Sequence, residues 1–163
     1  MITQDYIMRM IDQLVKVLSR ILFNKQKGNY REAFNDIDTA LKKMLGLDYN
    51  LINSLSGKDI ISLLDFSKDD SSFTIKCIVI AKFLKENGEI KELRNNDNSN
   101  SVYDYRKALR LFLEGILRNN NNEFTFSEYY PDIKELAEKL GNHIPGDTKL
   151  LLSKFYKQIG KSS

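Results

Sequence analysis

The chain is poor in the residues and segments on which several classes of protein depend. It has one cysteine, Cys77, among 163 residues, so it cannot form an internal disulfide, and we expect a reducing, cytoplasmic environment. No apolar run approaches the roughly 20 residues that span a membrane. The first residues carry Asp5, Arg9 and Asp12 where a secretory signal would be uncharged. We therefore expect a protein without a signal peptide or membrane attachment.

Motifs of common catalytic and cofactor sites are also missing. The only histidine, His143, has no acidic or cysteine neighbour at ligand spacing, and Cys77 lies in an apolar segment where a thiol acts as packing. Neither GxxxxGK[ST] nor GxGxxG occurs. Residues 67–72 and 95–100 are polar but lack the ligand pattern of an EF-hand. We expect no catalytic residue, no cofactor and no metal, and therefore do not expect the protein to be an enzyme.

Charge gives little support to nucleic-acid binding. The 25 Lys and Arg against 22 Asp and Glu leave a net charge of +3, which is small and well mixed along the chain. Tryptophan is absent, and Tyr and Phe fall at helical core spacing rather than on a basic exposed strand. Both observations disfavour a nucleic-acid partner.

Helical periodicity runs through the whole sequence. Apolar residues between Thr3 and Phe23 recur every three or four positions and predict a helix with one broad buried face. Gly28 suits the left-handed residue that closes a helix, and Asn29 with Glu32 has the spacing of a capping box that opens the next. The buried face of the first helix is expected to contain Tyr6, Ile7, Met10, Ile11, Leu14, Leu18, Ile21 and Leu22.

Caps and breakers predict the remaining helices. Asp48 and Ser56 suit the N-caps of two short helices, and a β-branched segment from Ser72 is expected to be helical up to a stop at Gly88. Four further boundaries follow: Gly46 ends the second helix, Ser101 with Asp104 opens a helix over 102–118, Pro131 and Gly141 bound another, and Asp147 caps the last one.

Two sequence signatures recur in the same order. The pattern F-x-K-[QE]-x-G occurs at Phe23–Gly28, Phe83–Gly88 and Phe155–Gly160. The pattern Y-x-x-A-x-x-x-[IF]-x-x-[AG] occurs twice, 75 residues apart. Its small residues allow two helices to approach closely, and the larger ones fill the space beside them. Its two copies are Tyr30, Ala33, Ile37 and Ala40, and Tyr105, Ala108, Phe112 and Gly115.

The combination of the glycine turn with the second signature resembles a tetratricopeptide repeat, whose unit is a helical hairpin. Residues 3–45 match such a unit well, whereas the second copy requires an insertion at its turn and the third contains only the first helix and glycine. The segments "DYIMRMIDQL" and "ILFNKQKGNYREAF" also resemble an uncharacterised, tetratricopeptide-like protein family of Gram-positive bacteria. That resemblance implies an all-helical fold, no established activity and no catalytic residue.

The fold expected from these patterns is all-α and single-domain, with tetratricopeptide-like hairpins stacked in a short right-handed array of about six to eight helices. Its predicted parts are a first hairpin at 3–45, short helices at 48–66, a second hairpin at 72–118 with an inserted loop at 89–101, and a C-terminal helical pair at 127–160.

Such arrays present surface rather than reactive groups, so the expected function is non-catalytic binding of a protein or peptide. Asp5, Arg9, Asp12 and Lys16 form an outward strip of the first helix that could contact a partner. Residues 148–159, with Phe155 at the centre, are a second candidate surface, for a homo-oligomer. The alternatives are a ligand-binding helical protein with a pocket in its core and an RNA-binding helical repeat.

Overall fold

Helices make up nearly all of the structure. The computed structural model describes residues 2–65, 70–95, 98–119 and 125–161, which contain eight α-helices, two short 3-10 helices and no strand. The prediction of an all-α fold is confirmed. In chain order the α-helices are α1 (Ile2–Gln26), α2 (Tyr30–Leu45), α3 (Tyr49–Ser54), α4 (Gly57–Leu64), α5 (Asp70–Asn95), α6 (Asn98–Arg118), α7 (Tyr130–Leu140) and α8 (Gly146–Lys161).

The first hairpin, α1 with α2, has the predicted ends. Gly28 and Gly46 have φ angles of +76° and +70°, the left-handed conformation that glycine adopts most readily. The predicted capping box is wrong, because the side chain of Asn29 forms no hydrogen bond to the start of α2. The backbone N–H of Asn29 instead donates to the carbonyl of Asn24 at 2.8 Å, so backbone groups close this turn.

Helix α5 lies at the centre of the fold. It has no exposed residue from Ser71 to Ile90, and it packs against α1, α2, α4 and α6. A helix surrounded in this way is apolar on most of its circumference, which explains why its sequence lacks a clear amphipathic pattern. Its β-branched residues have a low helix propensity, and packing against the neighbouring helices compensates for it.

The predicted stop at Gly88 is wrong, because α5 continues to Asn95. Gly88 is a packing residue instead: a Cβ atom at this position would lie 2.5 Å from Cε1 of Tyr105. The predicted loop at 89–101 is wrong as well. Residues 89–95 belong to α5 and residues 98–101 to α6, while 96–97 lie outside the described residues.

Small residues allow the helices to approach closely, as predicted. Ala33 and Ala108 are fully buried. A Cβ atom at Gly115 of α6 would lie 2.8 Å from Cβ of Cys77 in α5. At the same crossing, the hydroxyl of Thr74 donates to the Gly115 carbonyl at 2.6 Å. The second signature thus marks a direct contact between α5 and α6.

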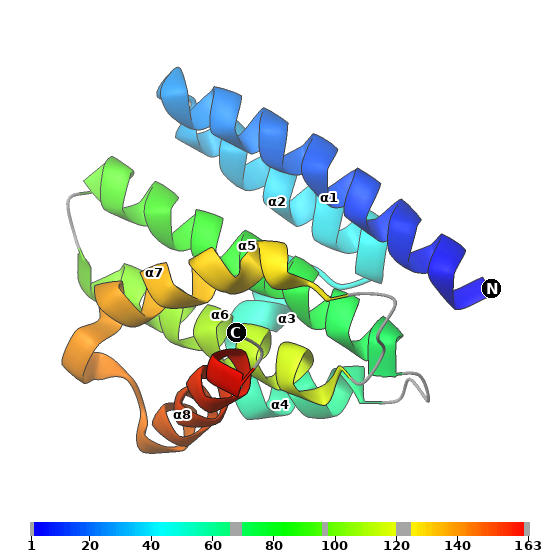
Figure 1. Cartoon of the computed structure of the whole chain (residues 1–163). Coiled ribbons are helices and arrows are strands. Elements are labelled where there is room, and N and C mark those ends of the chain that lie inside the picture. Colours follow the sequence, from blue (N-terminus) through cyan, green and yellow to red (C-terminus); the bar gives the residue numbers. More distant parts are fainter. Residues whose placement is uncertain (1, 66–69, 96–97, 120–124, 162–163) are drawn as a thin grey trace.

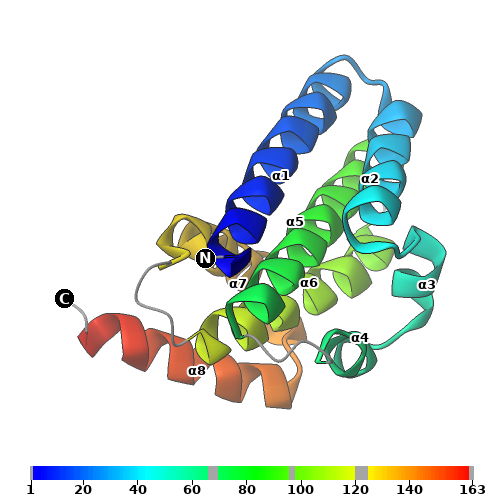
Figure 2. The same ribbon diagram turned by 90° about the vertical axis from the view of Figure 1, so that its right-hand side faces the viewer.

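Ion pairs join three helices in succession, α1 to α5 and α5 to α7. Figures 1 and 2 show α2 behind α1, α6 below α5, and α7 in front of α6. Ion pairs advance in the same direction along α5 and α7, from Lys82 with Asp132 to Glu92 with Lys139. The two helices are therefore parallel, and the end of α1 likewise lies beside the end of α5, where Lys25 meets Glu86.

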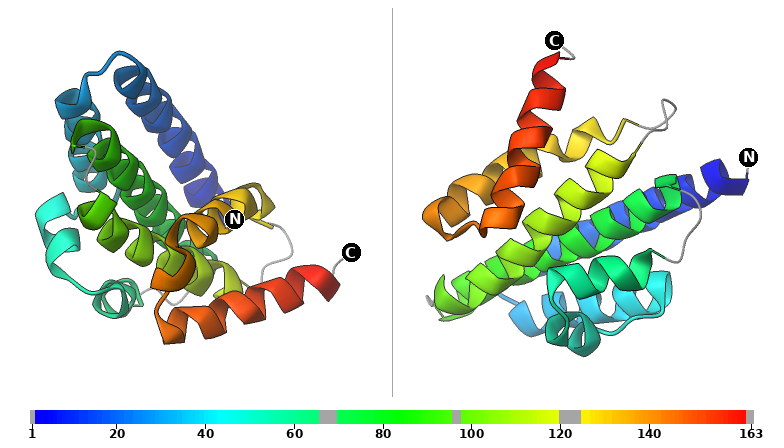
Figure 3. Two further views of the ribbon diagram at one scale, coloured as in Figure 1. Left: turned by 90° about the vertical axis from the view of Figure 1, so that its left-hand side faces the viewer. Right: turned by 90° about the horizontal axis from the view of Figure 1, so that it is seen from below.

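The C-terminal part closes one end of the molecule. Pro131 lies in the first turn of α7 and Gly141 ends it, as predicted. Helix α8 lies across α6 and α7 (Figure 3). The predicted helix openings at Ser101 and Asp147 are wrong, because α6 begins at Asn98 and α8 at Gly146. Ser101 is buried within α6 and donates to Glu92 at 3.3 Å, whereas Asp147 pairs with Arg110.

Candidate functional site

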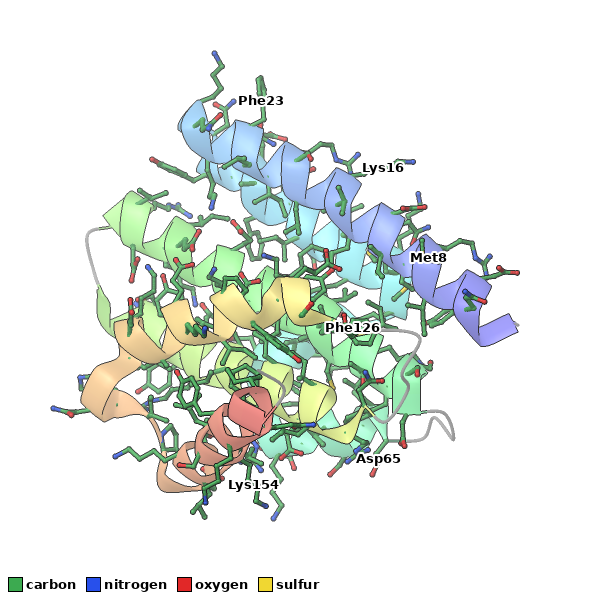
Figure 4. All side chains as sticks on the ribbon, viewed as in Figure 1. Met8, Lys16, Phe23, Asp65, Phe126 and Lys154 are labelled. Atoms are coloured by element: carbon green, nitrogen blue, oxygen red, sulfur yellow. The ribbon has the colours of Figure 1, made fainter. Side chains whose placement is uncertain are left out.

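The predicted strip of Asp5, Arg9, Asp12 and Lys16 is exposed along α1. Figure 4 shows the side chain of Lys16 extending from α1 away from the other helices. The spacing of three or four residues keeps these side chains on one face of the helix. They are therefore accessible, and their contact with a partner remains a prediction.

Next to this strip lies an apolar surface that includes Leu22, which was predicted to be buried. Met8, Val15 and Leu22 are 48%, 54% and 52% exposed. They are seven residues apart, and half-buried Ile11 and Leu18 lie between them. We call these five residues the α1 stripe. It borders the face that packs in the core, and its half-buried members Ile11 and Leu18 also contact that core. The core face consists of Ile7, Met10, Leu14, Val17 and Ile21.

The α1 stripe has the spacing of a helix that packs against another helix. Apolar residues at alternating intervals of three and four repeat every 3.5 residues on average, the period of a coiled-coil seam. Helix α1 therefore has apolar residues beyond its core face, and the rest of the described chain leaves Met8, Val15 and Leu22 of the stripe about half exposed. Phe23, 57% exposed, extends the uncovered surface (Figure 4).

Ion pairs join α1 to α5 and α5 to α7. Lys25 at the end of α1 bonds both Glu86 and Glu89 of α5, the latter at 2.7 Å. Burial lowers the pKa of Lys25, but the hydrogen bonds and charges of the two glutamates outweigh it, so the pKa is raised. Lys85 of α5 similarly bonds Asp132 and Glu135 of α7 at 2.8 and 2.7 Å. These groups are engaged in helix packing.

A cavity of about 330 Å³ opens between α2, α3, α5 and α6. Its aromatic walls are Tyr30 and Phe34 of α2 and Tyr49 of α3. The rings of Phe34 and Tyr49 meet edge to face with centroids 5.0 Å apart. The remaining lining residues come from the last turns of α5 and the start of α6: Asn87, Ile90, Lys91, Arg94 and Asn100.

Buried polar groups are linked at the inner end of this cavity. Asn87 donates to the Tyr49 hydroxyl at 2.7 Å and to Asp104 at 3.2 Å. Lys91 pairs with the same carboxylate oxygen of Asp104, Oδ2, at 2.7 Å. Burial raises the pKa of Asp104 despite the opposing effect of Lys91. Burial and then the charge of Asp104 raise the pKa of Tyr49.

Phe155 does not form the predicted contact surface. It is only 1% exposed, and its ring packs edge to face against Tyr130 with centroids 5.0 Å apart. Helix α8 therefore packs down on the fold. The exposed apolar side chains of this helix are Leu150 and Tyr156, at 68% and 42%, so self-association through 148–159 remains a prediction that would involve these two residues.

The remaining reactive candidates occupy structural positions. Cys77 is fully buried, and burial raises the pKa of its thiol far above the usual value. His143 lies in the 3-10 turn after α7, where its backbone carbonyl accepts from Arg106 at 2.8 Å. Across residues 2–65, 70–95, 98–119 and 125–161, no group of three His, Cys, Asp or Glu residues is placed to hold a metal ion. No helix in those ranges has the length and apolarity to cross a membrane.

The architecture defines an all-helical protein of packed hairpins, with an uncovered apolar stripe on its first helix. Comparison with protein families identifies it further: a family described as a family of unknown function (DUF6483) matches residues 1–161, so the chain belongs to this family. No curated protein and no solved structure matches the chain.

Proposed function

We propose that this chain is a non-catalytic interaction protein that binds a helical segment of a partner on the outer face of α1. The observation that carries the proposal is the α1 stripe, in which Met8, Val15 and Leu22 are each about half exposed. Contiguous exposed apolar surface bordered by charges is typical of protein interaction sites. An amphipathic helix offers the matching pattern of apolar anchors at three- and four-residue intervals.

The charged strip beside the stripe gives such a helix a direction. Asp5, Arg9 and Asp12 lie in the first half of α1 and leave it with a net negative charge on this strip, whereas Lys16 and Arg20 lie in the second half. A bound helix with basic residues facing the first half and acidic residues facing the second would complement both. Asp5, Arg9, Asp12 and Lys16 are thus proposed to orient the partner, while the stripe supplies most of the affinity.

The stacking of the hairpins supports a tetratricopeptide-like relationship, which we propose together with the function. Helix α5 packs against both helices of the first hairpin, and ion pairs join it to α1 and to α7. In arrays of this type, the first helices of successive units line the binding surface. We propose that α1 holds that position here.

A photo-crosslinking amino acid in place of Val15 tests the proposal in the cell that makes the protein. The matched control places the same group at Tyr103, which is 63% exposed on α6. We expect a discrete adduct from position 15 and none from position 103. An adduct of twice the chain mass would identify a second copy as the partner, and a larger or smaller one another protein. No adduct at position 15, or equal adducts at both positions, would refute the proposal.

The affinity of the captured complex can then be compared between wild type and variants. Val15→Glu places a charge in the centre of the stripe and should weaken the captured complex at least tenfold, while helicity measured by circular dichroism stays unchanged because the side chain is exposed. Leu150→Glu, on the exposed side of α8, is the control and should leave the complex intact.

A further inference from the structure

We propose that the cavity between α2, α3, α5 and α6 binds a small aromatic anion. This site is separate from the α1 stripe and does not depend on the function proposed above. The cavity has three aromatic side chains in its walls, a closed polar cluster that includes Lys91 at its inner end, and the cationic side chain of Arg94 at its rim.

The walls favour a flat apolar body. Tyr30 and Phe34 are four residues apart and therefore share one face of α2, and both are half-buried. Tyr49 and Ile90 complete the apolar lining. The volume of about 330 Å³ is at the lower end of the range for small-molecule sites, roughly 300 to 1,000 Å³. It therefore fits a molecule of two or three aromatic rings.

The inner end of the cavity has no charge left to neutralise. The carboxylate of Asp104 is 2% exposed and already accepts from Lys91 and Asn87. A buried ion pair adds little net stability compared with apolar packing. The cluster therefore stabilises the fold less than apolar side chains in the same place would. Its bonds instead fix Tyr49, Asn87 and Lys91 at the cavity wall before a ligand arrives, which reduces the entropy lost on binding.

The rim supplies the charge preference. Asn87, Lys91 and Arg94 lie three or four residues apart on one face of α5. Arg94 is exposed and forms no ion pair or hydrogen bond with the residues that the structure describes. The charge of Lys91 balances that of Asp104, so the guanidinium of Arg94 gives the rim of the cavity a net positive charge. A guanidinium bonds carboxylate, sulfonate or phosphate oxygens in a planar, bidentate manner, so the ligand carries such a group beside its ring.

Two fluorescent probes with the same rings separate the two requirements. 1-Anilinonaphthalene-8-sulfonate is an aromatic anion, and N-phenyl-1-naphthylamine is its uncharged counterpart. We expect saturable binding of the anion at one site of the folded protein, and weaker binding of the neutral probe. Arg94→Glu should weaken the anion at least tenfold and change the affinity for the neutral probe less than twofold. Phe34→Ala should weaken both probes.

Val15→Glu is the control for binding at the α1 stripe, and it should leave the affinity of both probes unchanged. Circular dichroism and thermal melts establish that each variant is folded, and the exposed position of Arg94 keeps that test valid even if Phe34→Ala is destabilised. The proposal is overturned if the anion does not saturate, if Arg94→Glu leaves its affinity unchanged, or if Val15→Glu removes it.

Discussion

Gly88 of α5 lies directly against the ring of Tyr105 in α6. A Cβ atom at Gly88 would be 2.5 Å from Cε1 and 2.9 Å from Cδ1 of that ring, and Tyr105 is 2% exposed. The glycine therefore provides the space in which the aromatic side chain is buried. The contact joins α5 to α6, which pack together as the second hairpin of the fold.

Gly88→Ala should lower the free energy of unfolding by about 1–2 kcal/mol. Alanine gains up to about 1 kcal/mol over glycine in an open helical position, but overpacking a rigid core costs roughly 1–3 kcal/mol. Urea denaturation measures the difference. Gly160→Ala is the matched control within α8, where a Cβ atom would meet nothing within 4 Å, and it should cause no loss. Equal effects of the two substitutions would contradict the packing role.

The same contact can be measured as a coupling. In a Tyr105→Leu background, the ring that opposes the new Cβ is gone, so Gly88→Ala should cost at least 0.5 kcal/mol less than in the wild type, a typical coupling for residues in contact. Strictly additive effects would show that the two side chains do not interact.

Gly28→Val should destabilise the protein by about 1 kcal/mol or more, for a different reason. Its φ of +76° strains any side chain with a Cβ atom, although there is open space around it. Gly28→Asn should cost less, because asparagine tolerates the left-handed conformation better than valine. Thermal melts of the two variants test this prediction, and an unchanged melting curve for Gly28→Val would exclude it.

The stabilisation from Lys25 should disappear in alkali. The folded state raises the pKa of Lys25 above its ordinary value of 10.5, so its contribution is fully present below pH 10.5 and is lost as the pH rises through the folded pKa. Lys25→Met should therefore cost roughly 2 kcal/mol at pH 8, between the values for exposed and buried pairs. That cost should shrink above pH 10.5.

Urea denaturation of wild type and Lys25→Met at pH 8, 9.5 and 11 measures the dependence. Lys149→Met, at an exposed position of α8, is the control for the removal of one positive charge. A cost that stays constant up to pH 11, or an equal cost for Lys149→Met, would argue against the ion pairs as its source.

Local signals predicted the helix ends where neighbouring residues decide them. Asp48 and Ser56 accept the expected capping bonds from Leu51 and Asp59, at 2.8 and 3.1 Å. Gly88 shows the limit of such signals, because it closes the same F-x-K-[QE]-x-G pattern as Gly28 and yet lies inside a helix. Gly88 differs from Gly28 in packing against Tyr105, and the position of Tyr105 beside it follows from tertiary packing alone.

The candidate sites were harder to predict for the same reason. The apolar positions of α1 fit one broad face, and only the packing of α2 and α5 shows that Leu22 is uncovered while Ile21 is buried. The cluster of Asn87, Lys91 and Asp104 combines two helices and an aromatic residue from a third. A regular heptad spacing in Met8, Val15 and Leu22 was the one signal in the sequence that could have separated the two faces of α1.

The enclosed position of α5 has a consequence for how the protein could be divided. Stacked hairpins are often modular, and a terminal unit can be deleted without loss of the others. Here α1 and α2 both pack against α5, which has no exposed residue from Ser71 to Ile90. Cutting the chain after Gly46 would expose the side of α5 that α1 and α2 cover to water. Neither fragment should therefore fold alone, and the whole chain should unfold in a single cooperative transition.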